Sequence, residues 1–130
     1  MKILLIVKSA VEVSAGLAFA LFPSMLVSLL LGSPLDGPVG TVIGRIAGVA
    51  LLTLGIACWL ARNDGQSTGT TGLIVALLFY DAAVVLIFLL ARLAVGLSGI
   101  GLWPGVVLHS GLGIWSFLCL RKFSRWPRLR

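Results

Sequence analysis

Four apolar runs, separated by short turn-forming segments, constrain the fold of this chain more than any other feature. They occupy residues of about 3–31, 41–61, 72–95 and 99–120. Each run reaches the roughly 20 residues that an α-helix needs to cross a bilayer. Helix-ending residues fill the segments between the runs: GSPLDGPVG, RNDGQSTGTTG and GLSGIGLWPG. The sequence predicts one all-α domain, an antiparallel bundle of four membrane-spanning helices, whose first helix tilts or bends at Pro23.

Composition agrees with this prediction and excludes other classes of protein. The chain is 59% hydrophobic and 11% charged, whereas a soluble domain carries about 25% charged residues. An isoelectric point near 10.4 would also suit a nucleic-acid-binding protein. However, half of the ten basic residues lie in 121–130 and the others flank apolar runs, which is a pattern of membrane topology. We therefore expect an integral membrane protein whose surroundings are the lipid bilayer, with no nucleic-acid partner.

The start of the chain resembles a signal peptide, because a basic residue precedes an apolar run that ends in Ala-Phe-Ala. A signal peptide has an uninterrupted apolar region after its basic start. Lys8 and Glu12 interrupt this one, and the apolar residues continue to Leu31. We therefore expect an uncleaved first helix.

The basic residues also predict the orientation of the bundle, because cytoplasmic loops are enriched in Lys and Arg. Eight of the ten lie on the side that holds both termini, and Arg45 and Arg92 lie on the other. Both termini are therefore expected in the cytoplasm, at a bacterial inner membrane, with Arg45 and Arg92 reaching the outer head groups. The tail 121–130 is either an ordinary cytoplasmic anchor or a strip that binds anionic lipid or an acidic partner. Its contact residues would be Arg121, Lys122, Arg125, Trp126, Arg128 and Arg130.

One polar residue from each predicted helix reaches a similar depth in the membrane. With a rise of about 1.5 Å per residue, Glu12, Thr53, Asp81 and His109 lie roughly 14–18 Å from the inner end of their runs. A charge at this depth costs several kcal/mol unless it is paired or wetted, so such residues face the bundle interior. We expect these four residues to form a buried polar cluster, although Thr53 could instead bond its own backbone.

The charged members of the predicted cluster have few available partners. Arg92 follows Asp81 by eleven residues, which places it about 16 Å away along the same helix. His109 is therefore the expected partner of Asp81. Lys8 precedes Glu12 by one turn and can neutralise it within one helix. Each pair could be a structural clasp, or a site that binds a proton.

Small residues recur at four-residue intervals in two of the runs, on one face of each predicted helix. Such rows let neighbouring backbones approach closely in membranes. We expect the second and fourth helices to be the closest-packed pair. The rows are Gly40, Gly44 and Gly48 in the second helix, and Gly101, Gly105, His109 and Gly113 in the fourth.

The sequence contains no phosphate loop, HExxH, CxxC or nucleophile elbow, so a conventional enzyme is not expected. With a single histidine, we expect neither a zinc site nor any cofactor. Two cysteines are too few for a disulfide framework. Cys58 and Cys119 are therefore expected to be reduced packing residues.

Two resemblances accompany these patterns. The stretch VEVSAG resembles the first helix of small multidrug resistance transporters, which implies proton exchange for cationic drugs at Glu12. The stretches GRIAGVALLTLGIACWLARND, LFYDAAVVLIFLLARL and LWPGVVLHSGLGIW resemble small four-helix membrane proteins of the DoxX-like and related uncharacterised groups. That resemblance implies the same fold and association with respiratory or other redox partners.

Three functions fit these features. The first is a non-catalytic accessory, assembly or stabilising subunit of a larger membrane complex, packed against other subunits or itself. It is favoured by the glycine rows, the short loops and the absence of catalytic motifs. The second is a proton-coupled small-molecule transporter that uses Glu12 or the Asp81–His109 pair. The third is a protein or enzyme that binds a lipid, sterol or quinone within the bundle.

Overall fold

The structure, a computed structural model, describes residues 1–124, and all of its regular elements are helices. The predicted all-α class is therefore confirmed for this part of the chain. Four of the helices are long and apolar enough to cross a membrane, judged by length and composition. The helices described are α1 (Lys2–Leu21), α2 (Pro23–Leu31), α3 (Gly37–Ala61), α4 (Thr68–Ala94) and α5 (Leu102–Ser124).

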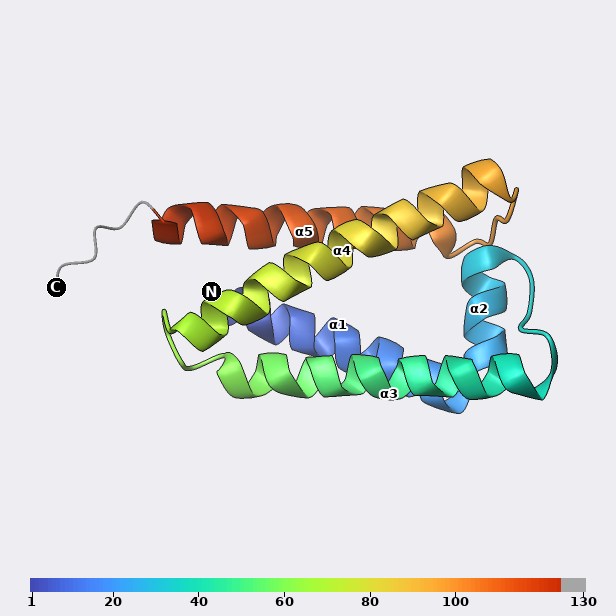
Figure 1. The fold of residues 1–130 in the computed structure, drawn as a ribbon, viewed down its shortest axis with the longest axis horizontal. Helices are drawn as coiled ribbons and strands as arrows, with labels where there is room; N and C mark the ends of the chain where they lie inside the picture. The colour runs from blue at the N-terminus through green and yellow to red at the C-terminus, as the bar shows by residue number, and fades with distance from the viewer. Residues whose placement is uncertain (125–130) are drawn as a thin grey trace, which may run out of the picture.

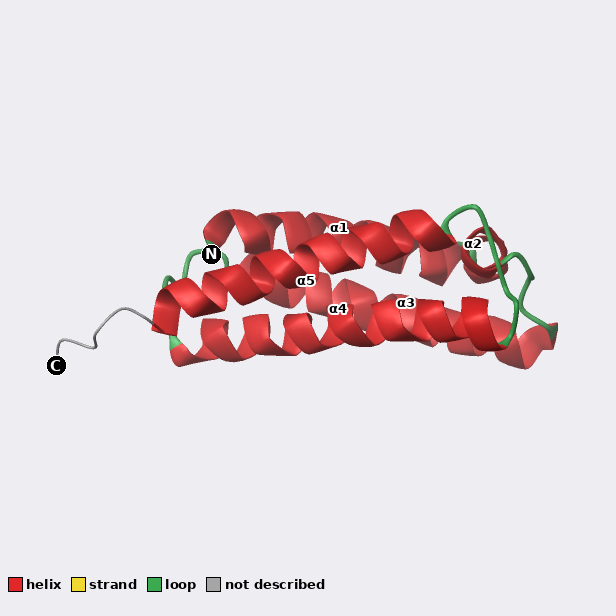
Figure 2. Ribbon diagram, turned by 90° about the horizontal axis from the view of Figure 1, so that it is seen from above, coloured by secondary structure: helices red, strands yellow, loops and turns green. Residues whose placement is uncertain are grey.

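The four long helices run up and down the molecule, each antiparallel to the next long helix in the chain (Figures 1 and 2). The N-terminus, the α3–α4 connection and the end of α5 lie at one end of the bundle. The short helix α2 and the α4–α5 connection lie at the opposite end. This layout agrees with the predicted antiparallel bundle and places both ends of the described chain on one side.

The first apolar run breaks where Pro23 stands, as one of the two predicted alternatives has it. Proline has no N–H and a fixed φ, so it suits the first position of a helix and not the interior. Accordingly α1 ends at Leu21, Phe22 leaves the helical region with φ −131° and ψ 55°, and α2 begins at Pro23. The new helix lies across the end of the bundle (Figure 1).

The α4–α5 connection holds α2 in place through backbone contacts. The N–H of Gly99 donates to the carbonyl of Leu30 at 3.2 Å, and that of Gly101 to Leu29 at 2.8 Å. An added Cβ on Gly99 would lie 2.6 Å from the carbonyl carbon of Leu30 and overlap the backbone of α2, so only glycine fits this close approach. The end of the bundle that holds α2 is therefore built from two segments far apart in the sequence.

The closest helix contacts join α1 to α3 and α4 to α5. Gly16 and Gly48 face each other, since a Cβ on either would lie 2.8 Å from the other's carbonyl oxygen. The prediction that the second and fourth membrane helices form the closest pair is therefore wrong, because Gly48 of α3 meets α1. Two glycines of α5 instead face α4, with Gly105 against Phe88 and Gly113 against Asp81.

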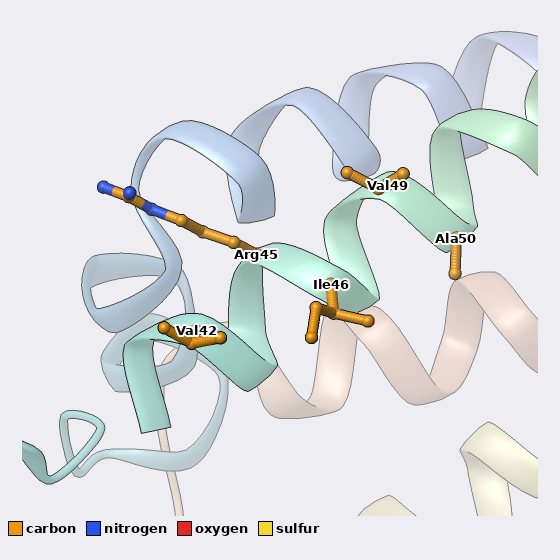
Figure 3. A pocket seen from close by; sticks show the side chains of 5 residues that line it. All are labelled: Val42, Arg45, Ile46, Val49 and Ala50. Atoms are coloured by element: carbon orange, nitrogen blue, oxygen red, sulfur yellow. The ribbon is translucent and has the colours of Figure 1, made fainter. Parts of the chain in front are cut away.

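The outward faces of the long helices carry large apolar side chains that are exposed in the isolated chain, as lipid contact requires. On α3 they border an open groove of about 440 Å³. Figure 3 shows its lining side chains along one stretch of that helix. The groove is lined by Val42, Arg45, Ile46, Val49 and Ala50.

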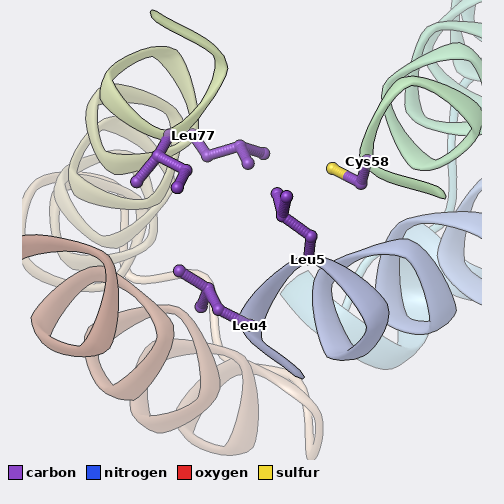
Figure 4. Packing of buried hydrophobic residues seen from close by; sticks show 5 residues of the cluster. Leu4, Leu5, Cys58 and Leu77 are labelled. Atoms are coloured by element: carbon purple, nitrogen blue, oxygen red, sulfur yellow. The ribbon is translucent and has the colours of Figure 1, made fainter. Parts of the chain in front are cut away.

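A small apolar core joins the helices near the end that holds the N-terminus. Figure 4 shows Leu4 and Leu5 of α1 pointing toward Leu77 of α4 and Cys58 of α3. These side chains are fully buried, and Cys119 packs partly buried against them. Both cysteines are free thiols and behave as small packing residues.

Candidate functional site

Four ionisable side chains meet between the helices, just beyond the apolar core. Lys8 and Glu12 come from α1, Asp81 from α4 and His109 from α5; together they are called the core cluster. Lys8, Glu12 and Asp81 are at most 1% exposed, and the His109 side chain is 13% exposed. Lys8 and Glu12 share one face of α1 because they are four residues apart, and that face also carries the buried Leu4 and Gly16.

Asp81 is the centre of the core cluster, and both of its carboxylate oxygens have partners. Oδ2 accepts a hydrogen bond from Lys8 Nζ within a buried ion pair. Oδ1 lies 3.0 Å from Nδ1 of His109. The predicted Asp81–His109 contact is therefore present, and Lys8 is a second partner of Asp81.

The partner of Lys8 differs from the prediction. It was predicted to neutralise Glu12 within α1, but its hydrogen bond goes to Asp81 on α4. The long side chain reaches across the bundle, where its charge meets a carboxylate that is as deeply buried as itself. Lys8 still attracts Glu12 electrostatically. One ammonium group thus lies near two carboxylates and bonds to one of them.

Glu12 is the unsatisfied member of the core cluster. Its Oε1 is buried, and no hydrogen-bond partner for that atom exists among the described residues. Its ionisable neighbours are Lys8, which attracts the carboxylate, Asp81, which repels it, and His109, which attracts it when protonated. A buried polar atom without a partner commonly costs about 1–3 kcal/mol, so this carboxyl group is held in an unfavourable place.

The core cluster has a net negative formal charge. One lysine and two carboxylates sum to minus one while His109 is neutral. Uncompensated charge is strongly disfavoured in a low-dielectric interior. One bound proton, on Glu12 or on the Asp81–His109 pair, would bring the sum to zero. By formal charge, the arrangement can therefore take up one proton.

The surroundings of His109 fix the position of its ring. Tyr80 packs edge-on against it, with ring centroids 5.6 Å apart and an interplanar angle of 79°. Gly113, one turn further along α5, lets α4 come close, since an added Cβ would lie 3.4 Å from Cβ of Asp81. Tyr80 was missed as a member of the site, and the available signal was its position next to Asp81 in the sequence.

Thr53, predicted as the fourth member of the cluster, lies outside it. The side chain is exposed, and its hydroxyl donates to the carbonyl of Val49 at 2.9 Å. The inward face of α3 is marked by the buried Gly48 and Gly55. Thr53 follows Gly48 by five residues, which turns it about 140° away on an α-helix. The alternative reading, a bond to its own backbone, is therefore correct.

The predicted surface contacts are distributed as follows. Arg45 and Arg92 are exposed on α3 and α4. Arg121 lies with Cζ 5.7 Å from the centroid of the Phe117 ring, and Lys122 is exposed beside it. The other predicted contacts of the tail lie outside the described residues: Arg125, Trp126, Arg128 and Arg130.

Within residues 1–124, no group of three or more His, Cys, Asp or Glu side chains is placed to hold a metal ion. The carboxylate of Asp81 is engaged by Lys8 and His109 instead. No protein-family model, curated protein or solved structure matches the chain.

Proposed function

We propose that this chain is an integral protein of a bacterial inner membrane, with both termini in the cytoplasm. Four apolar helices of sufficient length support membrane insertion. The orientation is supported by the basic residues of the described chain outside the core cluster: Lys2, Arg62, Arg121 and Lys122 belong to the end of the bundle that holds the N-terminus, and Arg45 and Arg92 to the other.

Within this membrane protein, we propose that the core cluster takes up and releases one proton and couples it to the movement of a small molecule. The observation that carries the proposal is Glu12, a buried carboxyl group whose Oε1 lacks a partner among the described residues. Ionisable groups in membrane helices that face the bundle interior typically mark proton and substrate pathways. The cluster has the charge deficit that such a carrier needs.

Lys8 supplies a link between protonation and helix arrangement. It stands one turn before Glu12, so it can serve either that carboxylate or Asp81. While Glu12 holds the proton, Lys8 stays with Asp81 and ties α1 to α4. When the proton leaves, ionised Glu12 competes for Lys8 and weakens that tie. Because α1 packs on α3 and α4 on α5, the loosened contact lies between two helix pairs that can move as units.

The test uses protein reconstituted in liposomes with a pH gradient, a pH-sensitive dye and a lipophilic cation such as ethidium. Wild type should exchange protons for the cation, and Glu12→Gln should lose the exchange while remaining folded. Thr53→Val is the matched control, since Thr53 lies at similar depth but is exposed. Exchange that persists in Glu12→Gln, or is absent from wild type, would overturn the proposal.

A second candidate is the accessory subunit of a larger membrane complex. It is favoured by Asp81, whose two oxygens bond to partners on two other helices. Such a satisfied clasp fixes helix register and suits a rigid scaffold. This candidate predicts stable co-purification with other membrane proteins and no effect of Glu12→Gln on that association.

A further inference from the structure

The open groove on α3 lies away from the core cluster and is not used by the proposed proton chemistry. Three of its five lining side chains, Val42, Ile46 and Val49, are large, apolar and more than half exposed. Ala50, at one end of this row in Figure 3, contributes only a methyl group, which leaves that end of the surface hollow. The fifth is Arg45, whose charged end points away from the apolar side chains in Figure 3. A groove with an apolar floor and a cationic end fits an amphipathic ligand.

Arg45 has no hydrogen bond or ion pair with any residue of the described chain. It follows the first residue of α3 by eight positions, about 12 Å along the axis. Asp36, before that helix, is about 13 Å away by the same measure. Because α3 has 25 residues, it is about 37 Å long and overshoots a hydrocarbon core of about 30 Å by a few ångström at each end. The Cα of Arg45 therefore lies about 8 Å inside the hydrocarbon boundary, and its long side chain extends toward the lipid head groups.

The position within the helix distinguishes Arg45 from Arg92, an exposed arginine of α4. Arg92 lies in the last turn of α4, where the partial negative charge of the helix end stabilises a cation. Arg45 is the ninth of the 25 residues of α3, beyond the first turn, where neither helix end stabilises its charge. Arg45 thus needs an external anion more than Arg92 does. A guanidinium group is suited to phosphate oxygens, with which it forms paired hydrogen bonds.

We propose that this groove is a binding site for one anionic phospholipid. Arg45 holds the phosphate of the head group, and an acyl chain lies along the apolar residues toward Ala50 at the other end of the groove. An anionic head group is preferred over a zwitterionic one because only the former leaves a net negative charge to balance Arg45. The site would lie in the outer leaflet if the proposed orientation is correct, but the binding itself is independent of the proton proposal.

Native mass spectrometry of the purified full chain tests this site, with phosphatidylglycerol and phosphatidylcholine of equal chain length as probes. Wild type should retain one phosphatidylglycerol in preference to phosphatidylcholine. Arg45→Gln should weaken phosphatidylglycerol binding by about 10- to 100-fold, the range for loss of a charge-assisted hydrogen bond. Arg92→Gln is the matched control, because it removes the same charge from an exposed position outside the groove, and it should leave binding unchanged.

A second variant tests the groove without altering charge. Ala50→Leu adds a larger side chain at the hollow end of the groove. It should weaken binding of both lipids, because less room remains for the acyl chain. Equal weakening by Arg45→Gln and Arg92→Gln would show general surface electrostatics and overturn the proposal. A dimer of the chain in place of a lipid adduct, or no preference for phosphatidylglycerol in wild type, would overturn it as well.

Discussion

The Lys8–Asp81 ion pair gives the sharpest prediction about what holds the two helix pairs together. Both side chains are at most 1% exposed, so solvent screening does not weaken the pair as it does at a surface. Removing one partner of a buried ion pair typically costs about 3–5 kcal/mol, because the other charge is left uncompensated. We expect about 3 kcal/mol, the lower end of that range, for Lys8→Met, since Asp81 keeps His109 as a partner. We expect a similar cost for Asp81→Asn.

The double variant Lys8→Met with Asp81→Asn should cost far less than the sum of its parts. It removes both charges of the pair, so neither Lys8 nor Asp81 leaves the other uncompensated, although packing, the His109 contact and the attraction between Lys8 and Glu12 are disturbed. If the two single changes cost about 3 kcal/mol each and the double variant also about 3 kcal/mol, the coupling energy is about 3 kcal/mol, near the upper limit for neighbouring residues. By comparison, neutral hydrogen bonds between membrane helices average about 0.6 kcal/mol.

The assay is equilibrium unfolding in mixed micelles with increasing dodecyl sulfate, followed by tryptophan fluorescence. The control cycle combines Asp81→Asn with Arg92→Gln. Arg92 is exposed and eleven residues further along the same helix, so those changes should add. A Lys8–Asp81 coupling below about 0.5 kcal/mol, the usual limit of additivity, would refute the ion pair as the link between the helix pairs.

Three further predictions concern packing and topology. Gly48→Ala should destabilise the protein by about 1–3 kcal/mol, because its new methyl group would lie 2.5 Å from the Ala20 backbone nitrogen; Gly111→Ala, with nothing within 4 Å, is the control in the same unfolding assay. Gly105→Ala should have a smaller effect, since its nearest neighbour is the Phe88 ring, which can turn aside, and equal melting losses at both glycines would contradict this ranking. A reporter fused after Arg130 should be active only if it functions in the cytoplasm, and activity of a periplasmic reporter there would reverse the proposed orientation.

The long helices could be predicted from the sequence because their causes are local. A run of about 20 apolar residues specifies a membrane-length helix on its own, and Pro23 ends a helix through its own covalent structure. The position of α2 across the bundle could not be predicted in this way. It depends on backbone bonds from Leu29 and Leu30 to Gly99 and Gly101, about seventy residues later in the chain, and spacing within one segment carries no information about them.

The choice of helix partners was mispredicted for a related reason. A row of glycines predicts a face that another backbone approaches, but it does not identify the approaching helix. Gly48 found its complement in Gly16 of α1, a single glycine that forms no row and therefore gave no signal. The short distance in sequence between successive helices favours their pairing, yet α3 packs sparsely on α4 and closely on α1.

The polar site was predicted in part because depth along a helix is easier to estimate than rotation about it. The estimated depths correctly predicted that Asp81 and His109 are neighbours. They wrongly predicted that Thr53 belongs to the same cluster. Rotation of 100° per residue from the glycine face of α3 would have excluded Thr53. Lys8 was assigned to Glu12 because a pair four residues apart is the simplest neighbour relation on a helix, whereas the lysine side chain is long enough to reach another helix.

A structural clasp between the helices would need only three of the four side chains of the core cluster, and Glu12 is the one it would not need. Lys8, Asp81 and His109 would join three helices equally well if a neutral residue replaced Glu12. Its carboxylate repels Asp81, competes for Lys8 and leaves Oε1 without a hydrogen bond within the described chain. Glu12→Gln removes the negative charge while keeping the size of the side chain, so it should leave stability unchanged or raise it, because the repulsion of Asp81 is lost, while proton exchange is lost. Stability and activity would then change in opposite directions, as at sites where function requires a locally unfavourable group. If Glu12→Gln instead unfolds the protein in the same assay that reports the Lys8–Asp81 coupling, Glu12 is part of the scaffold and the proton-carrier proposal fails.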